Sequence, residues 1–370
     1  MRAEILSDVD ALDAIAGDWD ALAVELGRPL ATPAWQIAWW RNVAPPSAAL
    51  AVVAVRDGHA LAGIAPFFVE RYGGLTRARM TATGVSVRND ILARRGAEPD
   101  VASAIAEAFQ AGPVRPDFLS LEGVYGRPAW ARGLASAWSR ADAYLEWRMP
   151  GPVLSMDGRT YEGWFASRSR NFRQQMRRDR RRVEQAGGRF RMTTAEELPR
   201  DLAAFARLYR ARWGDRGGSA PLSAGIVAML TETAERQNLT ERFQLWSLEI
   251  DGEIVSSHLF LAAGGEVSYW LGGFDERWSH VRPSIQTILV ALEHAWSQGA
   301  RRMDLGPGGH AYKYRFAEGD EPAEWWNVVP AGPRRVRATA FALGRRARKE
   351  IGARIPGPVR ERLRRIVRAA

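Results

Sequence analysis

The sequence has 370 residues but no cysteine, only two lysines and only five histidines. Without cysteine the chain has no disulfide framework, no thiol nucleophile and no thiolate-bound metal. The five histidines are scattered outside any metal-binding motif, so we expect no metal site. No apolar run reaches the ~18 residues of a membrane-spanning helix. The first residues are acidic where a signal peptide is basic and then apolar, so we expect a cytoplasmic protein.

The sequence also lacks the short motifs of several enzyme classes. It has no P-loop, no nucleophile elbow, no HExxH zinc motif and no dinucleotide-binding fingerprint after a strand. What it does have is an ordinary globular composition, with 46% hydrophobic and 25% charged residues. Since domains average roughly 150 residues, the length of the chain predicts two domains.

The formal net charge of +10 comes from the C-terminal end of the chain. Residues 333–370 hold thirteen basic and two acidic side chains, whereas the rest of the chain holds 39 basic and 40 acidic ones. In this tail, apolar residues recur at helical spacing among arginines: Val359, Leu363, Ile366 and Val367. The pattern is typical of a basic amphipathic helix on an anionic membrane, where each cation contributes ~1 kcal/mol. A tail that docks on the body and a disordered tail are the alternatives.

A second basic cluster lies inside the chain, with eight arginines and one aspartate between residues 168 and 182. Ser167 or Ser169 can cap a helix here, which Gly187 would end. The arginines face either solvent or an anionic ligand, such as the phosphates of coenzyme A, a phosphorylated or lipid-linked glycan, or tRNA. Phe172 is the single aromatic residue among them, which argues against base stacking, and we expect no DNA partner.

The N-terminal half predicts a mixture of helices and strands. An alternating apolar pair of segments around Asp57 and Gly58 is typical of a β-hairpin. Pro150, Gly151 and Pro152 then indicate a domain boundary. The predicted elements are helices at 11–26, 100–110 and 129–140, hairpin strands at 49–55 and 60–69, and a buried strand at 118–122.

The second half predicts two helices, three antiparallel strands, and then a helix, a strand, a loop or helix, and a last strand. Trp246, Leu248 and Ile250 alternate as a half-buried strand requires. The predicted elements are helices at 198–212 and 223–237 and from 284 onward, strands at 243–250, 254–262, 266–274, 302–305 and 324–330, and a loop or helix at 310–316. We therefore expect a mixed α/β fold with domains at 1–155 and 156–332 and a basic helical tail at 333–370.

Four segments of the second half carry a resemblance to a known family. They are SRNFR at 169–173, DGEIVSSH at 251–258, YWLGGFD at 269–275 and MDLGPGGHAYK at 303–313. In this order they resemble the GNAT acyltransferase fold, and more specifically its FemAB-like and CelD-like branch, the latter called cellulose-biosynthesis acetyltransferases. The resemblance covers about residues 157–330 and implies two tandem GNAT-like domains, of which the second is catalytic.

The resemblance implies a role for each candidate site residue. Acetyl-CoA lies in a gap between two diverging strands, here 266–274 and 303–305, with Gly272 and Gly273 allowing close approach. Its pyrophosphate meets the start of a helix at Arg282, Ser284, Ile285 and Gln286, although the usual glycines are missing there. The implied catalytic residues are Tyr312 as the acid for the leaving thiolate, Lys313 as a phosphate or carboxylate ligand, and Asp275 and His258 as candidate bases. The implied substrate-binding residues are Arg170, Asn171, Arg173, Tyr269 and His310.

These features predict an acyltransferase that moves an acetyl group from acetyl-CoA to an amine or hydroxyl of a sugar or cell-envelope precursor. The acceptor is expected to be a small molecule or a lipid-linked glycan, with the enzyme peripheral on the inner membrane through residues 333–370. Two alternatives are a FemAB-type aminoacyltransferase that uses aminoacyl-tRNA and an inactive protein that binds polyanions or membranes.

Overall fold

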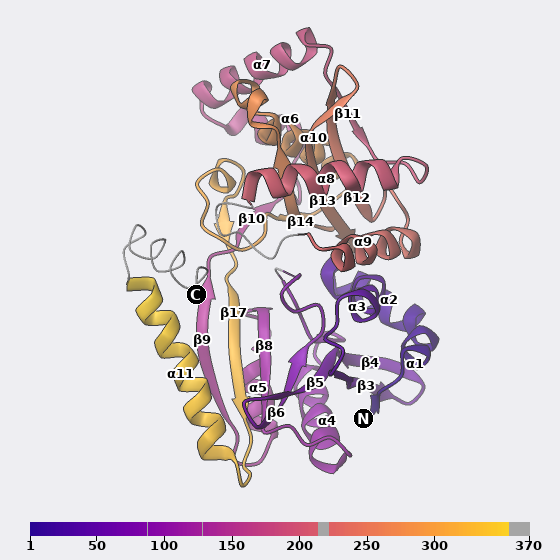
Figure 1. Cartoon of the computed structure of the whole chain (residues 1–370), viewed down its shortest axis with the longest axis vertical. Helices are drawn as coiled ribbons and strands as arrows, with labels where there is room; N and C mark the ends of the chain where they lie inside the picture. The colour runs from indigo at the N-terminus through magenta and orange to yellow at the C-terminus, as the bar shows by residue number, and fades with distance from the viewer. Residues whose placement is uncertain (87, 128, 214–221, 355–370) are drawn as a thin grey trace.

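The computed structural model describes residues 1–86, 88–127, 129–213 and 222–354, and their strands form three sheets (Figure 1). The four-stranded sheet contains β1 (Arg2–Leu6), β3 (Val52–Asp57), β4 (Ala60–Ala65) and β7 (Leu92–Ala93). The predicted hairpin is confirmed, because β3 and β4 pair antiparallel. The hairpin is shorter than predicted. Pro66 has no N–H to continue the ladder, and the chain beyond it joins a second sheet.

The six-stranded sheet crosses the predicted domain boundary. Its strands are β2 (Ala49–Leu50), β5 (Phe67–Tyr72), β6 (Leu75–Met80), β8 (Phe118–Tyr125), β17 (Ala323–Val329) and β9 (Asp142–Met149), in that order. We had expected residues 324–330 to end the second domain, and this placement is wrong. β17 pairs antiparallel with both β8 and β9, so the chain returns to the N-terminal half.

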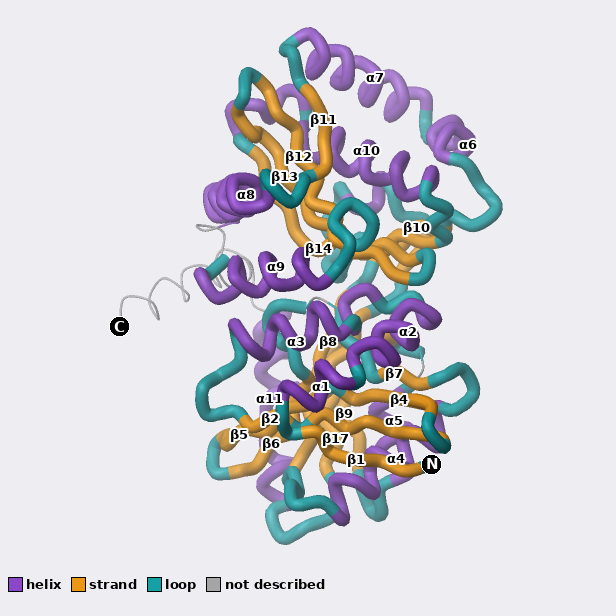
Figure 2. Tube along the Cα trace, turned by 90° about the vertical axis from the view of Figure 1, so that its right-hand side faces the viewer, coloured by secondary structure: helices purple, strands orange, loops and turns teal. Residues whose placement is uncertain are grey.

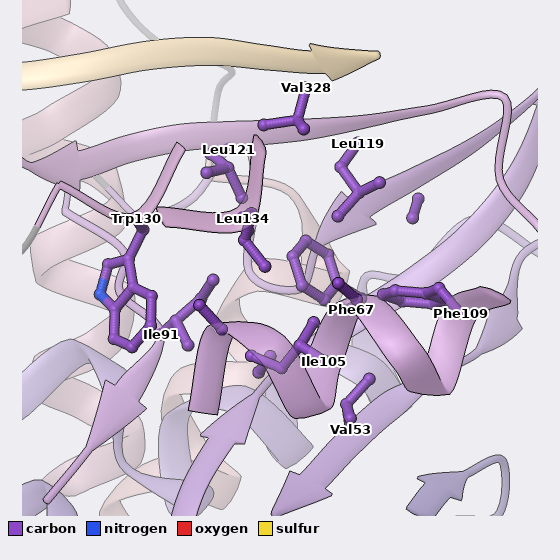
Figure 3. Packing of buried hydrophobic residues seen from close by; sticks show 14 of the residues in the cluster. Val53, Phe67, Ile91, Ile105, Phe109, Leu119, Leu121, Trp130, Leu134 and Val328 are labelled. Atoms are coloured by element: carbon purple, nitrogen blue, oxygen red, sulfur yellow. The ribbon is translucent and has the colours of Figure 1, made fainter. Parts of the chain in front are cut away.

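Contacts on both faces hold β17 in this sheet. Val328 is fully buried in the N-terminal core, and Figure 3 shows it beside Leu119 and Leu121 of β8. On the other face, Asn327 accepts a hydrogen bond from the Ser120 hydroxyl at 2.9 Å. The local pattern predicted the strand itself but not its partners, since Ser120 and Asn327 are 207 residues apart in the sequence.

The N-terminal helices cover these two sheets. They are α1 (Val9–Ala14), α2 (Ala16–Leu26), η1 (Pro29–Ala31), α3 (Pro33–Asn42), α4 (Glu98–Ala111) and α5 (Trp130–Ala137). The predicted helix at 11–26 is two helices that break at Ile15. Figure 3 shows Ile105 and Phe109 of α4 and Leu134 of α5 meeting Phe67, which fills the core between helices and sheet.

The seven-stranded sheet belongs to the C-terminal half. Its strands are β11 (Arg189–Met192), β12 (Phe243–Ile250), β13 (Glu253–Ala263), β14 (Glu266–Phe274), β15 (Arg302–Asp304), β10 (Pro152–Ser155) and β16 (Gly319–Asp320). The three predicted antiparallel strands are confirmed as β12, β13 and β14. Helices lie on both faces, because Leu259 and Leu261 of β13 pack with α8 while the intervening Phe260 packs with α10.

The helices of this half are α6 (Tyr161–Ser167), α7 (Arg170–Gln185), α8 (Leu198–Trp213), α9 (Ala224–Arg236), η2 (Glu276–Val281), α10 (Pro283–Ser297) and η3 (Lys313–Arg315). α7 to α10 lie close to their predicted positions and η3 falls in the predicted loop or helix, whereas α6 and η2 were not predicted. Local caps explain the agreement, since the Ser169 and Ser223 hydroxyls accept backbone N–H bonds at the starts of α7 and α9. α7 lies on the outside of the molecule, at the end away from the N-terminal half (Figures 1 and 2).

The basic tail is in part an ordinary packed helix. α11 (Arg335–Arg354) runs along β9 and buries Ala338 and Ala342 against Leu75 and Phe118 (Figure 1). For the first part of the tail at 333–370, the structure therefore shows the alternative in which the helix docks on the body. The amphipathic pattern from Val359 to Val367 lies outside the described residues. Among the residues that the structure describes, no helix is long and apolar enough to cross a membrane.

Candidate active site

The two strands predicted to diverge do so one residue before Tyr269. β14 and β15 pair in parallel over Glu266–Ser268 and Arg302–Asp304, after which β15 ends and β14 continues alone on that side. A cavity of about 300 Å³ opens at this point, and we call it the strand-gap cavity. Its walls are Arg212, Tyr269, Gly272, Phe274, Ser279, Arg282, Ser284, Ile285, His310 and Tyr312.

The start of α10 forms the basic end of the strand-gap cavity. Ser284 and Ile285 are in the wall, and their backbone N–H groups lie in the first helical turn, where they have no intrahelical partner. Arg282, the N-cap, lines the cavity as well and forms an ion pair with the buried Asp179 of α7 at 2.5 Å. Gln286 faces away, since its buried side chain donates to the Met176 carbonyl at 3.2 Å. This end of the cavity suits a phosphate group.

The two predicted glycines serve packing around the cavity. A Cβ atom on Gly272 would lie 1.9 Å from His258 Nδ1, so this glycine makes room for the imidazole ring. A Cβ atom on Gly273 would lie 2.6 Å from the Leu208 carbonyl carbon, so this one lets α8 approach the sheet. Gly272 lines the cavity and Gly273 does not.

Tyr312 and Tyr269 lie side by side in the cavity wall and their hydroxyls are hydrogen-bonded. Behind them, the Tyr269 hydroxyl is 3.2 Å from His258 Nδ1. Burial raises the pKa of both tyrosines above the ordinary value, and the bond from Tyr269 partly offsets this for Tyr312. Burial lowers the pKa of His258 to about 3, so its ring is neutral. His258 does not reach the cavity and therefore cannot be the base that contacts an acceptor.

Lys313 points away from the cavity and into the protein. Its ammonium group donates to the carbonyl oxygens of Gly306 at 2.8 Å and Pro307 at 2.9 Å. Burial lowers its pKa to about 8. On the other side of the same loop, Asp304 Oδ1 accepts from the Gly306 N–H at 2.7 Å. Lys313 and Asp304 thus fix the glycine-rich loop, and Lys313 contacts backbone rather than the ligand space.

Asp275 and the start of α7 also lie apart from the cavity. Asp275 caps η2 and pairs with Arg277 at 2.6 Å, and this guanidinium lowers the pKa of the carboxyl group. A carboxylate held in this way is a weaker base than a free one. Arg170 and Asn171 are exposed on the outer helix, and Arg173 donates to the Ala166 carbonyl at its foot. The structure does not bring these four residues to Tyr312.

A second cavity of about 400 Å³ lies between the two halves, and we call it the interdomain cavity. Its walls are Thr83, Gly84, Val85, Ser86, Glu122, Met149, Leu222, Ile226, Trp270, Leu271, Pro307, Gly308, His310 and Trp325. Both cavities share His310, whose ring stacks on Tyr312 with centroids 6.1 Å apart. Partial desolvation and the neighbouring Lys313 lower the pKa of His310, which favours the neutral imidazole that accepts a proton.

Several cavity residues were not predicted from the sequence. Thr83, Ser86 and Glu122 come from the N-terminal half, where no motif marked them. Glu122 is an ionised carboxylate, since the guanidinium of Arg79 at 2.6 Å helps to lower its pKa. Within the described ranges, no group of three or more His, Asp or Glu side chains could hold a metal ion.

Comparisons with known proteins agree with this geometry. The family model of the acetyltransferase (GNAT) domain matches residues 170–314, which run from the start of α7 into η3 and include most of the strand-gap cavity wall. No curated protein matches the sequence.

Solved structures resemble the whole chain. FemX superposes with a TM-score of 0.61 at 11% identity, over 88% of this chain and 97% of FemX. The C-terminal DUF2156 domain of a protein assigned as a lysylphosphatidylglycerol synthetase, from Agrobacterium fabrum, gives 0.57 at 13% identity over 89% and 95%. L-PGS from Bacillus licheniformis superposes with a TM-score of 0.53 at 12% identity, over 91% of this chain and 96% of L-PGS. At these identities the likeness establishes the fold, and it spans both halves. Residues 170–314 therefore match the GNAT acetyltransferase domain model and lie within a larger mixed α/β fold.

Proposed function

We propose that the protein transfers an acetyl group from acetyl-CoA to an amine or hydroxyl of a sugar or cell-envelope precursor. The observation that carries this proposal is that His310 stands in the wall of both cavities, next to Tyr312. A donor in the strand-gap cavity and an acceptor in the interdomain cavity would meet at this residue. The matched acetyltransferase domain supports the acyl donor, and the CelD-like branch stays our prediction.

The geometry suggests how each residue would act. The start of α10 and Arg282 would hold the phosphates of the donor. Neutral His310 would take the proton from the acceptor as its nitrogen or oxygen attacks the thioester carbon. When the carbon–sulfur bond breaks, its electron pair goes to sulfur, and Tyr312 would donate a proton to that sulfur. The proton on His310 then restores Tyr312, so the cycle closes without another reactant.

A second candidate is aminoacyl transfer from aminoacyl-tRNA. The likeness to FemX and to a protein assigned as a lysylphosphatidylglycerol synthetase favours it, as does the absence of the usual glycines at 282–287. The exposed arginines of α7, among them Arg177 and Arg181, would suit a phosphate backbone. The same arginines, with residues 355–370, would also suit an anionic inner-membrane surface, at which a lipid-linked acceptor would be presented.

Ligand-induced thermal stabilisation tests the donor. At a hundredfold excess over Kd, acetyl-CoA adds about 2.7 kcal/mol to the free energy of unfolding, which we expect to raise Tm by roughly 3–4 °C. Arg282→Gln should lose most of this shift relative to its own ligand-free Tm. Arg148→Gln, an exposed change in the other half, should keep it. A shift with aminoacyl-tRNA and none with acetyl-CoA would establish the second candidate instead.

A further inference from the structure

We propose that His258 and Tyr269 are positioning residues that turn the Tyr312 hydroxyl proton toward the strand-gap cavity. The inference rests on the proposed function in that Tyr312 is the acid. His258 Nδ1 is 3.2 Å from the Tyr269 hydroxyl, which is bonded to the Tyr312 hydroxyl, and both tyrosine rings line the cavity. The three groups form one chain that leads from the core to the reacting atoms.

The positions of the protons decide which group is the donor in each of these hydrogen bonds. Neutral His258 carries one ring proton, and Nε2 is buried with no hydrogen-bond partner. If the proton were on Nε2, the structure would bury an N–H group that donates to nothing, which proteins rarely do. The proton therefore belongs on Nδ1, which donates to the Tyr269 oxygen. Tyr269 then donates its own proton to Tyr312, because their hydrogen bond raises the pKa of Tyr269 and lowers that of Tyr312, as expected when Tyr269 is the donor.

With this order of hydrogen bonds, neither Tyr269 nor His258 accepts the Tyr312 proton, so this proton can point into the strand-gap cavity. When the carbon–sulfur bond breaks and sulfur takes that proton, the Tyr269 hydroxyl already faces the phenolate that forms. A hydrogen bond to the charged form stabilises it and makes Tyr312 the stronger acid. Arg212 of α8, which also lines the cavity, acts in the same direction.

The architecture around His258 supports a fixed ring. Its imidazole fits over Gly272, where any Cβ atom would collide with it, and Ser257 and Leu259 beside it are fully buried. The ring also tilts against Tyr269 with centroids 5.7 Å apart. An imidazole confined in this way cannot turn to exchange its two nitrogens. The hydrogen bonds among His258, Tyr269 and Tyr312 are thus in place before any ligand binds.

A kinetic double-mutant cycle tests the proposal. The assay is thiol release from acetyl-CoA with glucosamine as the acceptor, and the chain has no cysteine to react with the thiol reagent. We expect Tyr269→Phe to lower kcat about 10-fold with the KM for acetyl-CoA unchanged, and Tyr312→Phe to lower it ~100-fold or more. The double variant should be no slower than Tyr312→Phe, because Tyr269 acts through Tyr312. Losses that multiply in the double variant would overturn the proposal.

Two controls separate positioning from packing. His258→Gln keeps an N–H donor and should retain more activity than His258→Leu, which has none. Phe260→Leu loosens a ring that packs on Tyr269, at 5.2 Å between centroids, and should leave kcat close to that of the wild type. If His258→Gln is as slow as His258→Leu, the donor role is wrong.

Nitrogen NMR of the histidine rings tests the hydrogen bonds of His258 and Tyr269 without any substrate. The result is therefore valid even if acetyl-CoA is not the donor. With five histidines, the resonance that His258→Gln removes identifies His258. At pH 5 we expect this ring to be neutral, with its proton on Nδ1, and Tyr269→Phe to change the Nδ1 shift. A proton on Nε2 would overturn the inference, whereas an inactive wild type with the proton on Nδ1 would count against the proposed function alone.

Discussion

The four candidate catalytic residues differ in whether their side chains reach the strand-gap cavity. His258, Asp275, Lys313 and Tyr312 all sit in segments that resemble GNAT motifs, yet only Tyr312 reaches the strand-gap cavity. The Lys313 ammonium group donates to two backbone carbonyl oxygens, and His258 lies behind Tyr269, away from the cavity. Spacing in the sequence predicts that a residue lies near a site, but the direction of its side chain decides what it does there.

The buried, neutral state of His258 predicts an acid-sensitive stability. Its pKa is about 3 in the folded protein and 6.5 when exposed, so between these values the unfolded chain binds the extra proton. Stability is then lost as pH falls through this window, by ~2 kcal/mol between pH 7 and pH 5. Urea unfolding at the two pH values should show a smaller loss for His258→Gln than for the wild type. The exposed His59→Gln should behave like the wild type, and an unchanged pH effect in His258→Gln would contradict the prediction.

Among the elements, α11 and β17 lie where the sequence did not place them. Both come from the C-terminal end of the described chain, and both pack on the N-terminal half. α11 carries seven of the thirteen basic residues of the tail, but it also brings Ala338, Phe341 and Ala342 onto one face. Because Phe341 meets Tyr72 and Phe118 at ring distances of 5.0 and 5.1 Å, this face is an ordinary core contact.

Loss of that contact should release α11. Ala342→Asp places a charge among the apolar side chains of Leu75, Phe118 and Val329, and we expect the helix to detach because burying this charge costs more than the contact contributes. We expect trypsin to remove residues beyond 333 at least 10-fold faster than in the wild type. Ala340→Asp, on the exposed face of the same helix, should leave the rate unchanged. Mass spectrometry measures the cleavage rate of each variant. Equal rates for Ala342→Asp and Ala340→Asp would show that α11 is not docked.

For the whole molecule, a buried charge network joins the two halves beneath the site. Arg88 of the N-terminal half and Asp304 of β15 are almost fully buried and form an ion pair at 2.9 Å. Asp304 in turn holds the Gly306 N–H, so the N-terminal half anchors the glycine-rich loop. Nearby, Arg28 pairs with Asp90 at 2.8 Å, and the Tyr125 hydroxyl lies 3.2 Å from Glu266.

A thermodynamic cycle on the pair measures this coupling. Arg88→Met removes the nearer cation from the buried Asp304, which keeps only Arg302 at 3.7 Å, and should cost roughly 3 kcal/mol of unfolding free energy. Asp304→Asn keeps an acceptor for Gly306 and needs no cation. The double variant should therefore be more stable than the sum of the single losses predicts, by 1 kcal/mol or more in urea unfolding. Losses that simply add would show that the pair does not couple the halves.

The elements that depend on neighbours along the chain could be predicted from the amino-acid pattern. Apolar periodicity, serine caps and glycine turns act within a few residues, and they fixed α7 through α10, β12 to β14 and the hairpin of β3 and β4. The expectation of a gap between β14 and β15 near Tyr312 came instead from the resemblance to GNAT motifs, and Tyr312 lines the cavity that opens there.

The tertiary structure alone decided which segments meet. The return of β17 to the first sheet, the docking of α11, the burial of His258 and Lys313, and the cavity that His310 shares all depend on contacts between distant residues. No pattern within a segment encodes such a contact, because pairing and burial are set by the free energy of the whole packed chain. The interdomain cavity, with walls from both halves, exists only once those contacts have formed.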